Sequence, residues 1–383
     1  MYFGQGFLFG EGLLARLILV LVVGISFYYW VYAVSRYKLP LPLRLLSILL
    51  IIWTLYGIPP IVMGSKAIVS VGRETFYYLK SIYISVLPVF AFYVFARERW
   101  LTEDILKKWF VVFFVVAIGD YYYGLQTSLN KMSELGHNVT EATNNAGYMM
   151  ATLLCLAPLF YKKPGIQYVI IGACLLFTLG SLKRGAILCS VLSATAIILL
   201  SLKSNRDVLS PKRGNKKTVQ IVFFTALLII VGYYAVNSYL SSSDYFVYRL
   251  QETLEGNSSE RDDIYSTILN HFLFNSDIIS FLFGNGAYGT VEIFNTFAHN
   301  DWLEIAIDNG FFVLILYAVY WMSYINIIKK ANKSSTCTIM LIVFVIIYFF
   351  RSFFSMSYSD ITPFASCALG FSLANYQFKN RLE

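Results

Sequence analysis

A histidine and two carboxylates lie close together in the segment FAHNDWLE, at residues 297–304. His299 precedes a predicted helix start, for which Asn300 or Asp301 would be the N-cap and Glu304 would complete an acidic first turn. An imidazole has an unperturbed pKa of about 6.5, so small changes in its surroundings tune it as a base near neutral pH. The segment predicts His299 as a general base, with Asp301 and Glu304 as rival bases. The alternative is a histidine that serves the fold alone.

Cationic side chains lie on the same predicted side of the chain as His299. Lys183 and Arg184 form a short turn between two apolar runs, and Arg261 stands among acidic residues at the start of a predicted helix. Planar guanidinium groups suit a phosphate or pyrophosphate. Anionic lipid head groups and lipid-linked sugar pyrophosphates are the ligands available there. The alternatives are interfacial snorkelling for Lys183 and Arg184 and a local salt bridge for Arg261.

The elements that must position these groups are membrane helices. The 383 residues are 57% hydrophobic and only 14% charged, whereas about a quarter of the residues in soluble domains are charged. The apolar residues come in blocks of about 17 to 23, long enough to cross a hydrocarbon layer of about 30 Å. An all-α polytopic membrane protein is predicted, with residues 1–383 as a single integral membrane domain. A soluble enzyme, a nucleic-acid-binding domain and an outer-membrane barrel are excluded. Eleven spans are predicted, at residues 13–34, 45–63, 77–96, 109–124, 146–161, 166–181, 185–201, 219–236, 301–328, 337–354 and 361–376.

The basic residues predict the orientation of the spans. They concentrate in alternate connectors, and the positive-inside rule makes that side cytoplasmic, with the N-terminus outside and the C-terminus inside. The net charge of +8 is therefore explained by topology, and no nucleic-acid partner is expected. The largest outer loop, at residues 237–300, is predicted to contain short helices, one of them at 259–270, and to carry part of the active site.

Other candidate motifs are weak. Gly284, Gly286 and Gly289 have the spacing GxGxxG, but a dinucleotide site would need a strand before them and a helix after them, so a tight turn is favoured. The five cysteines lie singly in apolar spans, and the three histidines are widely separated. Neither a disulfide nor a metal site is predicted. Within the spans, the ionisable residues Asp120, Lys80 and Arg351 are second candidates for function.

Several segments together resemble a known family. They are SLKRGA at residues 181–186, SERDDI at 259–264, FGNG at 283–286, and HNDWLE at 299–304 followed by NG at 309–310. In order and spacing they resemble the bacterial O-antigen polymerase and O-antigen ligase superfamily. The segment NNAGY at 144–148 is similar to an Asn-containing segment of that family, so the resemblance covers residues 144–312.

The resemblance implies a GT-C-like glycosyltransferase in the bacterial inner membrane. It would act at the periplasmic face on oligosaccharides linked to undecaprenyl pyrophosphate, without a metal or other cofactor. Arg184 and Arg261 take the positions of the family's essential arginines, and His299 that of its essential histidine. Two features depart from the family: Lys183 stands where a small polar residue is common, and eleven spans are one fewer than a common count.

These observations predict a catalytic group and a substrate-binding group. His299, Arg261 and Arg184 form the first, and the second consists of Lys183, Asn300, Asp301, Glu304, Asn145 and Tyr288. A polysaccharide polymerase is favoured, with a chain-length regulator protein as a further partner. A ligase that passes the glycan to lipid A-core is the alternative. An oligosaccharide transporter, the alternative of another class, would require essential charges deep in the spans and symmetry between the two halves.

Overall fold

The computed structural model describes residues 13–63, 76–134, 144–208, 261–332 and 335–382, with single residues and short runs between 219 and 251. The helices of the long described segments are α2 (Leu13–Arg36), α3 (Leu41–Met63), α5 (Tyr77–Arg97), α6 (Glu103–Glu134), α7 (Ala146–Leu153), the 3₁₀ turn η2 (Ala157–Phe160), α8 (Pro164–Gly180), α9 (Arg184–Val208), α12 (Arg261–Asn270), the π-helical turn η3 (His271–Asn275), α13 (Ile278–Phe283), α14 (Gly289–Phe294), α15 (Asp301–Lys330), α16 (Thr336–Arg351) and α17 (Pro363–Leu382).

The prediction of an all-α polytopic membrane protein is confirmed. Five of these helices have a stretch long and apolar enough to cross a membrane: Arg16–Arg36, Leu41–Val62, Tyr77–Arg97, Arg184–Ser201 and Asp301–Lys330. Shorter apolar helices lie at Ala146–Phe160, Pro164–Gly180 and Thr336–Arg351. The predicted span at 219–236, the first part of the outer loop and the predicted helix start at residues 259 and 260 lie largely outside the described residues. The count of eleven spans and the orientation stay predictions.

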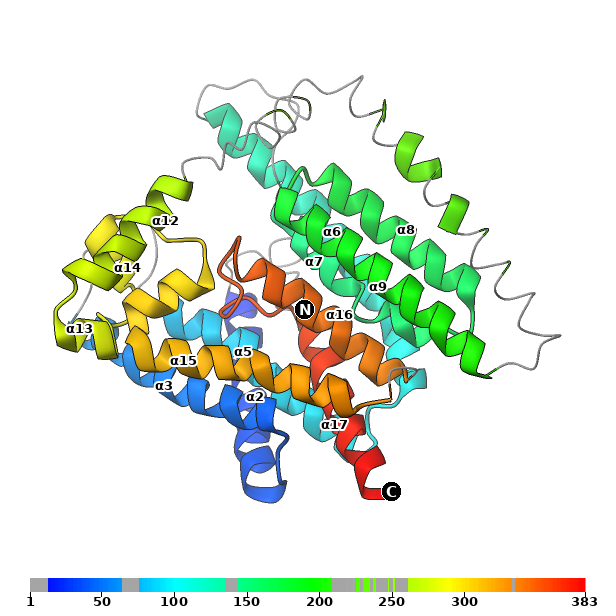
Figure 1. The fold of residues 1–383 in the computed structure, drawn as a ribbon, viewed down its shortest axis with the longest axis horizontal. Helices are drawn as coiled ribbons and strands as arrows, with labels where there is room; N and C mark the ends of the chain where they lie inside the picture. Colours follow the sequence, from blue (N-terminus) through cyan, green and yellow to red (C-terminus); the bar gives the residue numbers. More distant parts are fainter. Residues whose placement is uncertain are drawn as a thin grey trace.

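Helices α16 and α17 join two groups of helices. On one side α2, α3, α5 and α15 pack together, and on the other α6, α7, α8 and α9 do so, while α16 contacts α9 and α17 packs along α5. Figure 1 shows α12, α13 and α14 gathered at one end of this bundle, beside the first part of α15 and away from the C-terminus. The short helices before α15 therefore form a cap at one end of the bundle.

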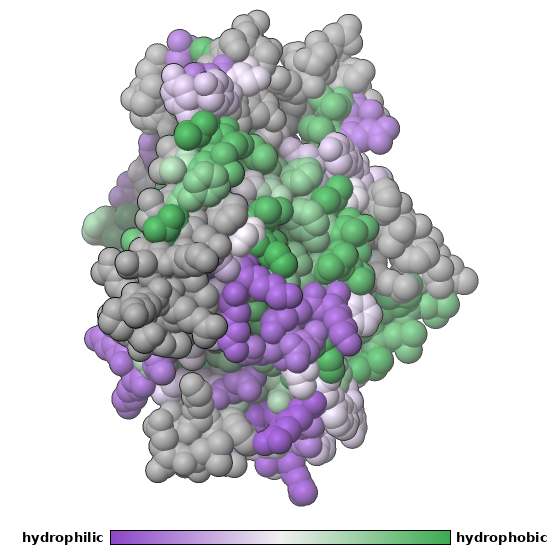
Figure 2. All heavy atoms as spheres, turned by 90° about the vertical axis from the view of Figure 1, so that its right-hand side faces the viewer, coloured by the Kyte–Doolittle hydropathy of each residue, from purple (hydrophilic) through white to green (hydrophobic). Residues whose placement is uncertain are grey.

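Large apolar side chains cover both the interior and much of the outer surface. Trp53, Phe90 and Phe344 are fully buried, whereas Val20 and Leu21 of α2 remain mostly exposed. On the face drawn in Figure 2, hydrophobic side chains reach the surface over a broad area beside a patch of hydrophilic ones. Exposed apolar surface of this extent is unusual for a protein surrounded by water and fits helices that face lipid.

The predicted span at 146–161 is not one continuous α-helix. Helix α7 ends at Leu153, and the following amides donate to carbonyls three residues back, as Cys155 N does to Thr152 O at 3.1 Å. Pro158 lies in the 3₁₀ turn η2 that follows. A proline has no N–H to donate and its ring crowds the preceding turn of an α-helix. This segment therefore continues as tighter turns towards Lys163.

The predicted span at 301–328 is also interrupted. Gly310 has φ 78° and ψ −179°, so α15 consists of a short first part, a kink and a long apolar part. The FGNG segment packs against this kink: Asn285 N donates to Ile307 O at 2.9 Å, and Gly286 N donates to Asp308 O at 2.9 Å. Gly284 and Gly286 have positive φ, as the predicted tight turn requires. These glycines bring two backbone segments into direct contact.

We expect Gly310→Ala to destabilise the protein strongly. A Cβ at this position would lie 2.4 Å from Gly284 N and 2.6 Å from Leu282 O, and the left-handed φ is itself costly for a residue other than glycine. A loss of at least about 2 kcal/mol is expected, measured as a lower thermal midpoint of the purified protein in detergent.

Gly24→Ala in α2 is the matched control, because nothing lies within 4 Å of a Cβ there. That variant should be as stable as the wild type or slightly more so, since alanine favours a helix. Equal midpoints for Gly310→Ala and the wild type would contradict the proposed contact.

Candidate active site

Three segments far apart in the sequence meet at the capped end of the bundle. The charges of Arg261, at the start of α12, and of Lys183, in the turn before α9, both act on the imidazole of His299. Arg261 Nη1 also donates to Phe354 O at 3.2 Å. A Cβ at Gly185, beside Arg184, would lie 3.5 Å from Phe354 Cβ. The structure thus brings together the three segments that carry the predicted catalytic residues.

The turn that carries Lys183 and Arg184 is held against the start of α7. Asn144 N donates to Ser181 O at 2.8 Å, and Lys183 N donates to Ser181 Oγ at 3.3 Å. Leu182 takes a left-handed φ of 54°, which turns the chain sharply so that α9 begins at Arg184. Both cationic side chains are half-buried at this turn.

The first asparagine of NNAGY holds this region together. Asn144 is buried, its Nδ2 donates to Tyr121 O at 2.7 Å, and its Oδ1 accepts from Ala146 N at 2.9 Å. Asn145 precedes α7, makes no side-chain cap hydrogen bond and is exposed. The role predicted for Asn145 in substrate binding stays a prediction. Asn144, which was not a candidate from the sequence, links α6 to the start of α7.

The backbone around His299 is fixed from both sides. Its φ is 53°, a left-handed conformation that persists in a residue other than glycine only where neighbouring contacts impose it. Ala298 N donates to Glu304 Oε1 at 2.6 Å, and Tyr265 Oη donates to His299 O at 3.4 Å. Of the two predicted N-cap residues, Asn300 caps α15 and accepts from the amides of residues 302 and 303. These contacts present the imidazole at the surface of the site.

The pKa of His299 is lowered from its usual value of 6.5. Partial desolvation is the main cause, and the positive charges of Arg261 and Lys183 add to it. Each of these effects disfavours the imidazolium form. His299 is therefore neutral at neutral pH and can accept a proton from a bound hydroxyl group.

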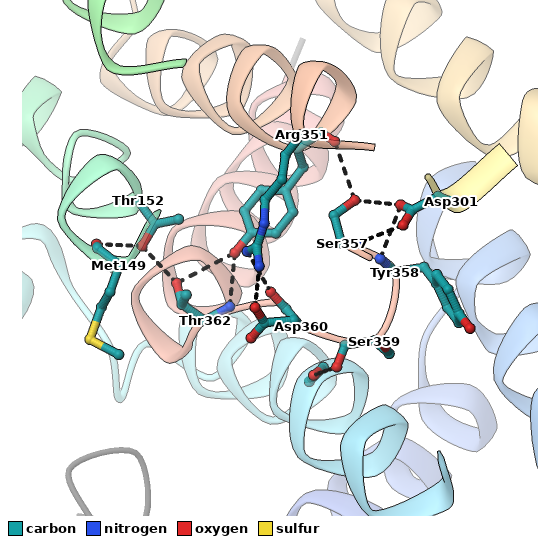
Figure 3. A network of polar contacts seen from close by, with 11 residues as sticks. Met149, Thr152, Asp301, Arg351, Ser357, Tyr358, Ser359, Asp360 and Thr362 are labelled. Carbon is teal, nitrogen blue, oxygen red and sulfur yellow. Dashed lines mark hydrogen bonds and ion pairs between the residues drawn. The ribbon is translucent and has the colours of Figure 1, made fainter. Parts of the chain in front are cut away.

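Asp301 has a structural role in the present arrangement. It is fully buried, and its carboxylate accepts from Tyr317 Oη at 2.8 Å, from Ser357 N at 2.6 Å, from Ser357 Oγ and from Tyr358 N at 3.1 Å. Figure 3 shows this carboxylate turned towards Ser357 and Tyr358. A substrate could reach it only by displacing these donors, so the contacts do not favour the predicted roles in substrate binding and as a rival base.

Glu304 and Tyr288 are buried as well. The carboxylate of Glu304 is engaged by the amide of Ala298, inside the loop that precedes α15. Tyr288 N donates to Asp308 Oδ2 at 3.2 Å, and its ring packs against Tyr78 with the ring centroids 5.5 Å apart. The side chain of Glu304 therefore supports the backbone that presents His299, whereas the ring of Tyr288 packs in the core. The assignment of both to substrate binding stays a prediction.

The connection between α16 and α17, residues 352–362, forms the floor of the site and was missed by sequence reasoning. Besides binding Arg261 through Phe354 O, it offers Phe353 O, which accepts from Tyr265 Oη at 3.2 Å and from Asn300 Nδ2 at 3.4 Å. Most of these bonds use backbone carbonyls, so residue types gave no signal. Only Arg351, which directly precedes this connection, was a candidate from the sequence.

Arg351 is buried below the site and pairs with Asp360. Its Nη1 donates to Asp360 O at 3.0 Å, its Nη2 contacts the Asp360 carboxylate, and its guanidinium lies 4.5 Å from the centroid of the Tyr148 ring. Figure 3 shows this pair beside the contacts of Thr152 and Thr362. Asp120 lies in α6 and Lys80 in α5, and a functional role for either stays a prediction.

Within the part of the chain that the structure describes, no three His, Cys, Asp or Glu side chains group so that they could hold a metal ion. The expectation that the chemistry needs no metal stays a prediction. Chemically, the cations can bind an anionic leaving group, and the neutral imidazole beside them can accept a proton from an attacking hydroxyl group.

Comparison with known proteins adds one match. Residues 168–318 match the family model described as O-Antigen ligase. The match begins in α8 and ends in α15, so it contains Lys183, Arg184, Arg261 and His299. No curated protein and no solved structure matched the chain.

We expect Lys183→Gln to raise the pKa of His299. Removing a nearby positive charge makes the imidazolium less unfavourable, so the titration midpoint should move to higher pH. NMR titration of protein labelled in its three histidines can measure it, with His299→Gln identifying the signal. Lys183→Arg keeps the charge and should keep the pKa low. An unchanged or lower midpoint in Lys183→Gln would show that this charge does not act on His299.

We expect Asp301→Asn to loosen residues 352–362. An amide can no longer accept from all four donors, and a buried donor left without a partner costs about 1–3 kcal/mol. The thermal midpoint should fall, and the amides of Ser357 and Tyr358 should exchange with deuterium faster. Asp263→Asn, at an exposed position of α12, is the control and should leave both unchanged. Unaltered exchange at Ser357 in Asp301→Asn would refute the role of this carboxylate.

Proposed function

We propose that this protein, which belongs to the superfamily of O-antigen ligases and polymerases through residues 168–318, polymerises a surface polysaccharide. Family members are glycosyltransferase-like enzymes that act on lipid-linked glycans, and the chain is a multi-pass membrane protein. In the proposed reaction, the growing glycan passes from undecaprenyl pyrophosphate to the non-reducing-end sugar of another lipid-linked repeat unit. The site would face the periplasm from the bacterial inner membrane.

The observation that carries this proposal is the convergence of two cations on one neutral histidine. Arg261 donates to Phe354 O, and the turn that carries Lys183 and Arg184 lies beside the same residue; both Arg261 and Lys183 lower the pKa of His299. A cationic pocket beside a proton acceptor fits a reaction in which a diphosphate leaves while a hydroxyl group loses its proton. The matched family acts on lipid-linked glycans, which supports this proposal.

The proposed step transfers the sugar in one exchange of bonds. The acceptor hydroxyl oxygen attacks the anomeric carbon of the donor, and His299 takes the hydroxyl proton. The bond between the anomeric carbon and the diphosphate oxygen breaks, and the diphosphate leaves with the electron pair. Its negative charge grows in the transition state, where Arg261 and Arg184, with Lys183 as a further contact, would stabilise it more than in the ground state. A diphosphate is already a good leaving group, so this step needs no metal.

A ligase remains the second candidate because the matching family model is described as O-Antigen ligase. Both enzymes would use the same donor and the same cationic pocket, and they differ in the acceptor. The polymerase uses a lipid-linked repeat unit, and the ligase uses lipid A-core. A chain-length regulator is proposed as a partner of the polymerase alone.

Purified protein supplied with a lipid-linked repeat unit alone tests the proposal. A ladder of lengthened products is expected, whereas product that forms only after lipid A-core is added would identify a ligase. Arg261→Ala and His299→Ala should each abolish product, because the leaving group loses a cation or the hydroxyl loses its base. Arg36→Ala, at the end of α2, is a matched arginine control and should keep full activity.

Equal membrane levels and equal elution in detergent would show that these variants insert normally. A normal ladder from His299→Ala or Arg261→Ala would remove that residue from the proposed chemistry. Failure of the wild type to form product with either acceptor would argue against both transferase assignments.

A further inference from the structure

The segment between α12 and the FGNG turn exposes large apolar side chains. Eight of the thirteen residues at 271–283 are Phe, Leu or Ile. Exposed fractions reach 77% for Phe274, 69% for Ile278 and 68% for Ile279, and about half of Leu273 and Phe283 is exposed. Contiguous apolar surface of this kind marks contact with a membrane or a partner.

This surface is continuous with the lipid-facing side of two membrane helices. The ring of Phe281 stacks on Phe311 of α15 with centroids 5.3 Å apart, and that of Phe283 lies 5.6 Å from Phe312, which is itself about half exposed. Tyr56 of α3 donates its hydroxyl hydrogen to Phe283 O. The end of this segment, at Phe281 and Phe283, therefore lies against two helices that are apolar enough to span the membrane.

We propose that residues 271–283, called here the apolar hairpin, lie in the membrane and not in water. They would occupy the leaflet nearest the candidate site. Hydrocarbon is the occupant that fits, because the hairpin extends the surface that α15 already presents to lipid. Its one carboxylate, Asp277, caps α13 by accepting from Ile279 N at 2.9 Å and Ser280 N at 3.1 Å. A polar residue at the edge of a short apolar helix is typical of elements that lie in the membrane interface.

A groove lies beside the candidate site, between α12, which directly precedes the hairpin, and the start of α15. It has a volume of about 280 Å³, and its lining includes Leu269 of α12, Trp302 and Leu303 of α15, and Phe353. Tyr265 also lines it, and its hydroxyl donates to His299 O. If the hairpin lies in the leaflet, the groove opens sideways into the bilayer. The prenyl chain of the lipid carrier then occupies the groove with its diphosphate at Arg261, a step that rests on the proposed function.

Spin labels can measure the depth of the hairpin without any substrate. In a variant that lacks the five native cysteines, labels at Phe274→Cys and Ile278→Cys should be more accessible to oxygen than to a water-soluble nickel reagent in vesicles. A label at Thr267→Cys, at an exposed polar position of α12, is the control and should show the reverse. Equal accessibility at the three positions would overturn the membrane seat, whether or not the protein is a polymerase.

Binding of prenyl diphosphates tests the groove without requiring turnover. Leu269→Trp should weaken the binding of undecaprenyl pyrophosphate several-fold and leave that of inorganic pyrophosphate, which has no prenyl chain, unchanged, because the larger side chain fills the groove beyond the diphosphate. Leu273→Trp, on the exposed face of the hairpin, is the matched control and should bind both as the wild type does.

An equal loss for both ligands, or none, would overturn the groove as the prenyl site while the depth measurement still decides the membrane seat. Absence of diphosphate binding by the wild type would count against the proposed function and would leave the depth result intact.

Discussion

The buried carboxylate of Asp301 fixes the relation between the start of α15 and the connection from α16 to α17. Its hydrogen bonds to Ser357 and Tyr358 hold residues 352–362 under the site. Carbonyl groups of the same connection bind Arg261 and the side chain of Tyr265. A buried carboxylate is tolerated only when several donors satisfy it, so this arrangement allows little variation. The positions of Arg261 and His299 relative to each other therefore depend on a residue that does not face the site.

The glycines in the region that matches the family model have structural roles. Gly284 and Gly310 have left-handed φ and allow backbone contact between the loop and the kink of α15. This contact sets the direction in which the first part of α15 leaves the membrane helix. His299 also has a left-handed φ, which is a strained conformation for a residue other than glycine. Glu304 accepts a hydrogen bond from the adjacent amide of Ala298. Conformational strain and buried polar contacts at this end of the molecule are thus concentrated where the imidazole is presented.

Sequence patterns predicted the helices well because apolar runs of membrane length leave the backbone few alternatives. Asn300 as the N-cap of α15 was also predictable, since capping depends on neighbours in the sequence. The break at Pro158 was missed because hydrophobicity continues through it. The break at Gly310 was missed although the polar run DNG, at residues 308–310, marks it in the sequence, because these residues were counted into the long apolar span. The floor at residues 352–362 was missed for another reason: its contacts with α12 and α15 use carbonyl groups, which every residue carries. Asn144 was missed in favour of Asn145 because only the fold shows which of two adjacent amides points inwards.

The charges around His299 link the binding of an anionic donor to the pKa of the imidazole. The carboxylate of Asp301 is buried and accepts hydrogen bonds from the chain itself, whereas Lys183 and Arg261 remain half-exposed and lower the pKa of the imidazole. In the proposed reaction a diphosphate bound at these cations would offset their charge. The pKa of His299 would then rise towards its usual value, because a neighbouring anion favours the imidazolium form. His299 would stay unprotonated while the site is empty and become a stronger base once the donor is bound, when the acceptor proton has to be removed.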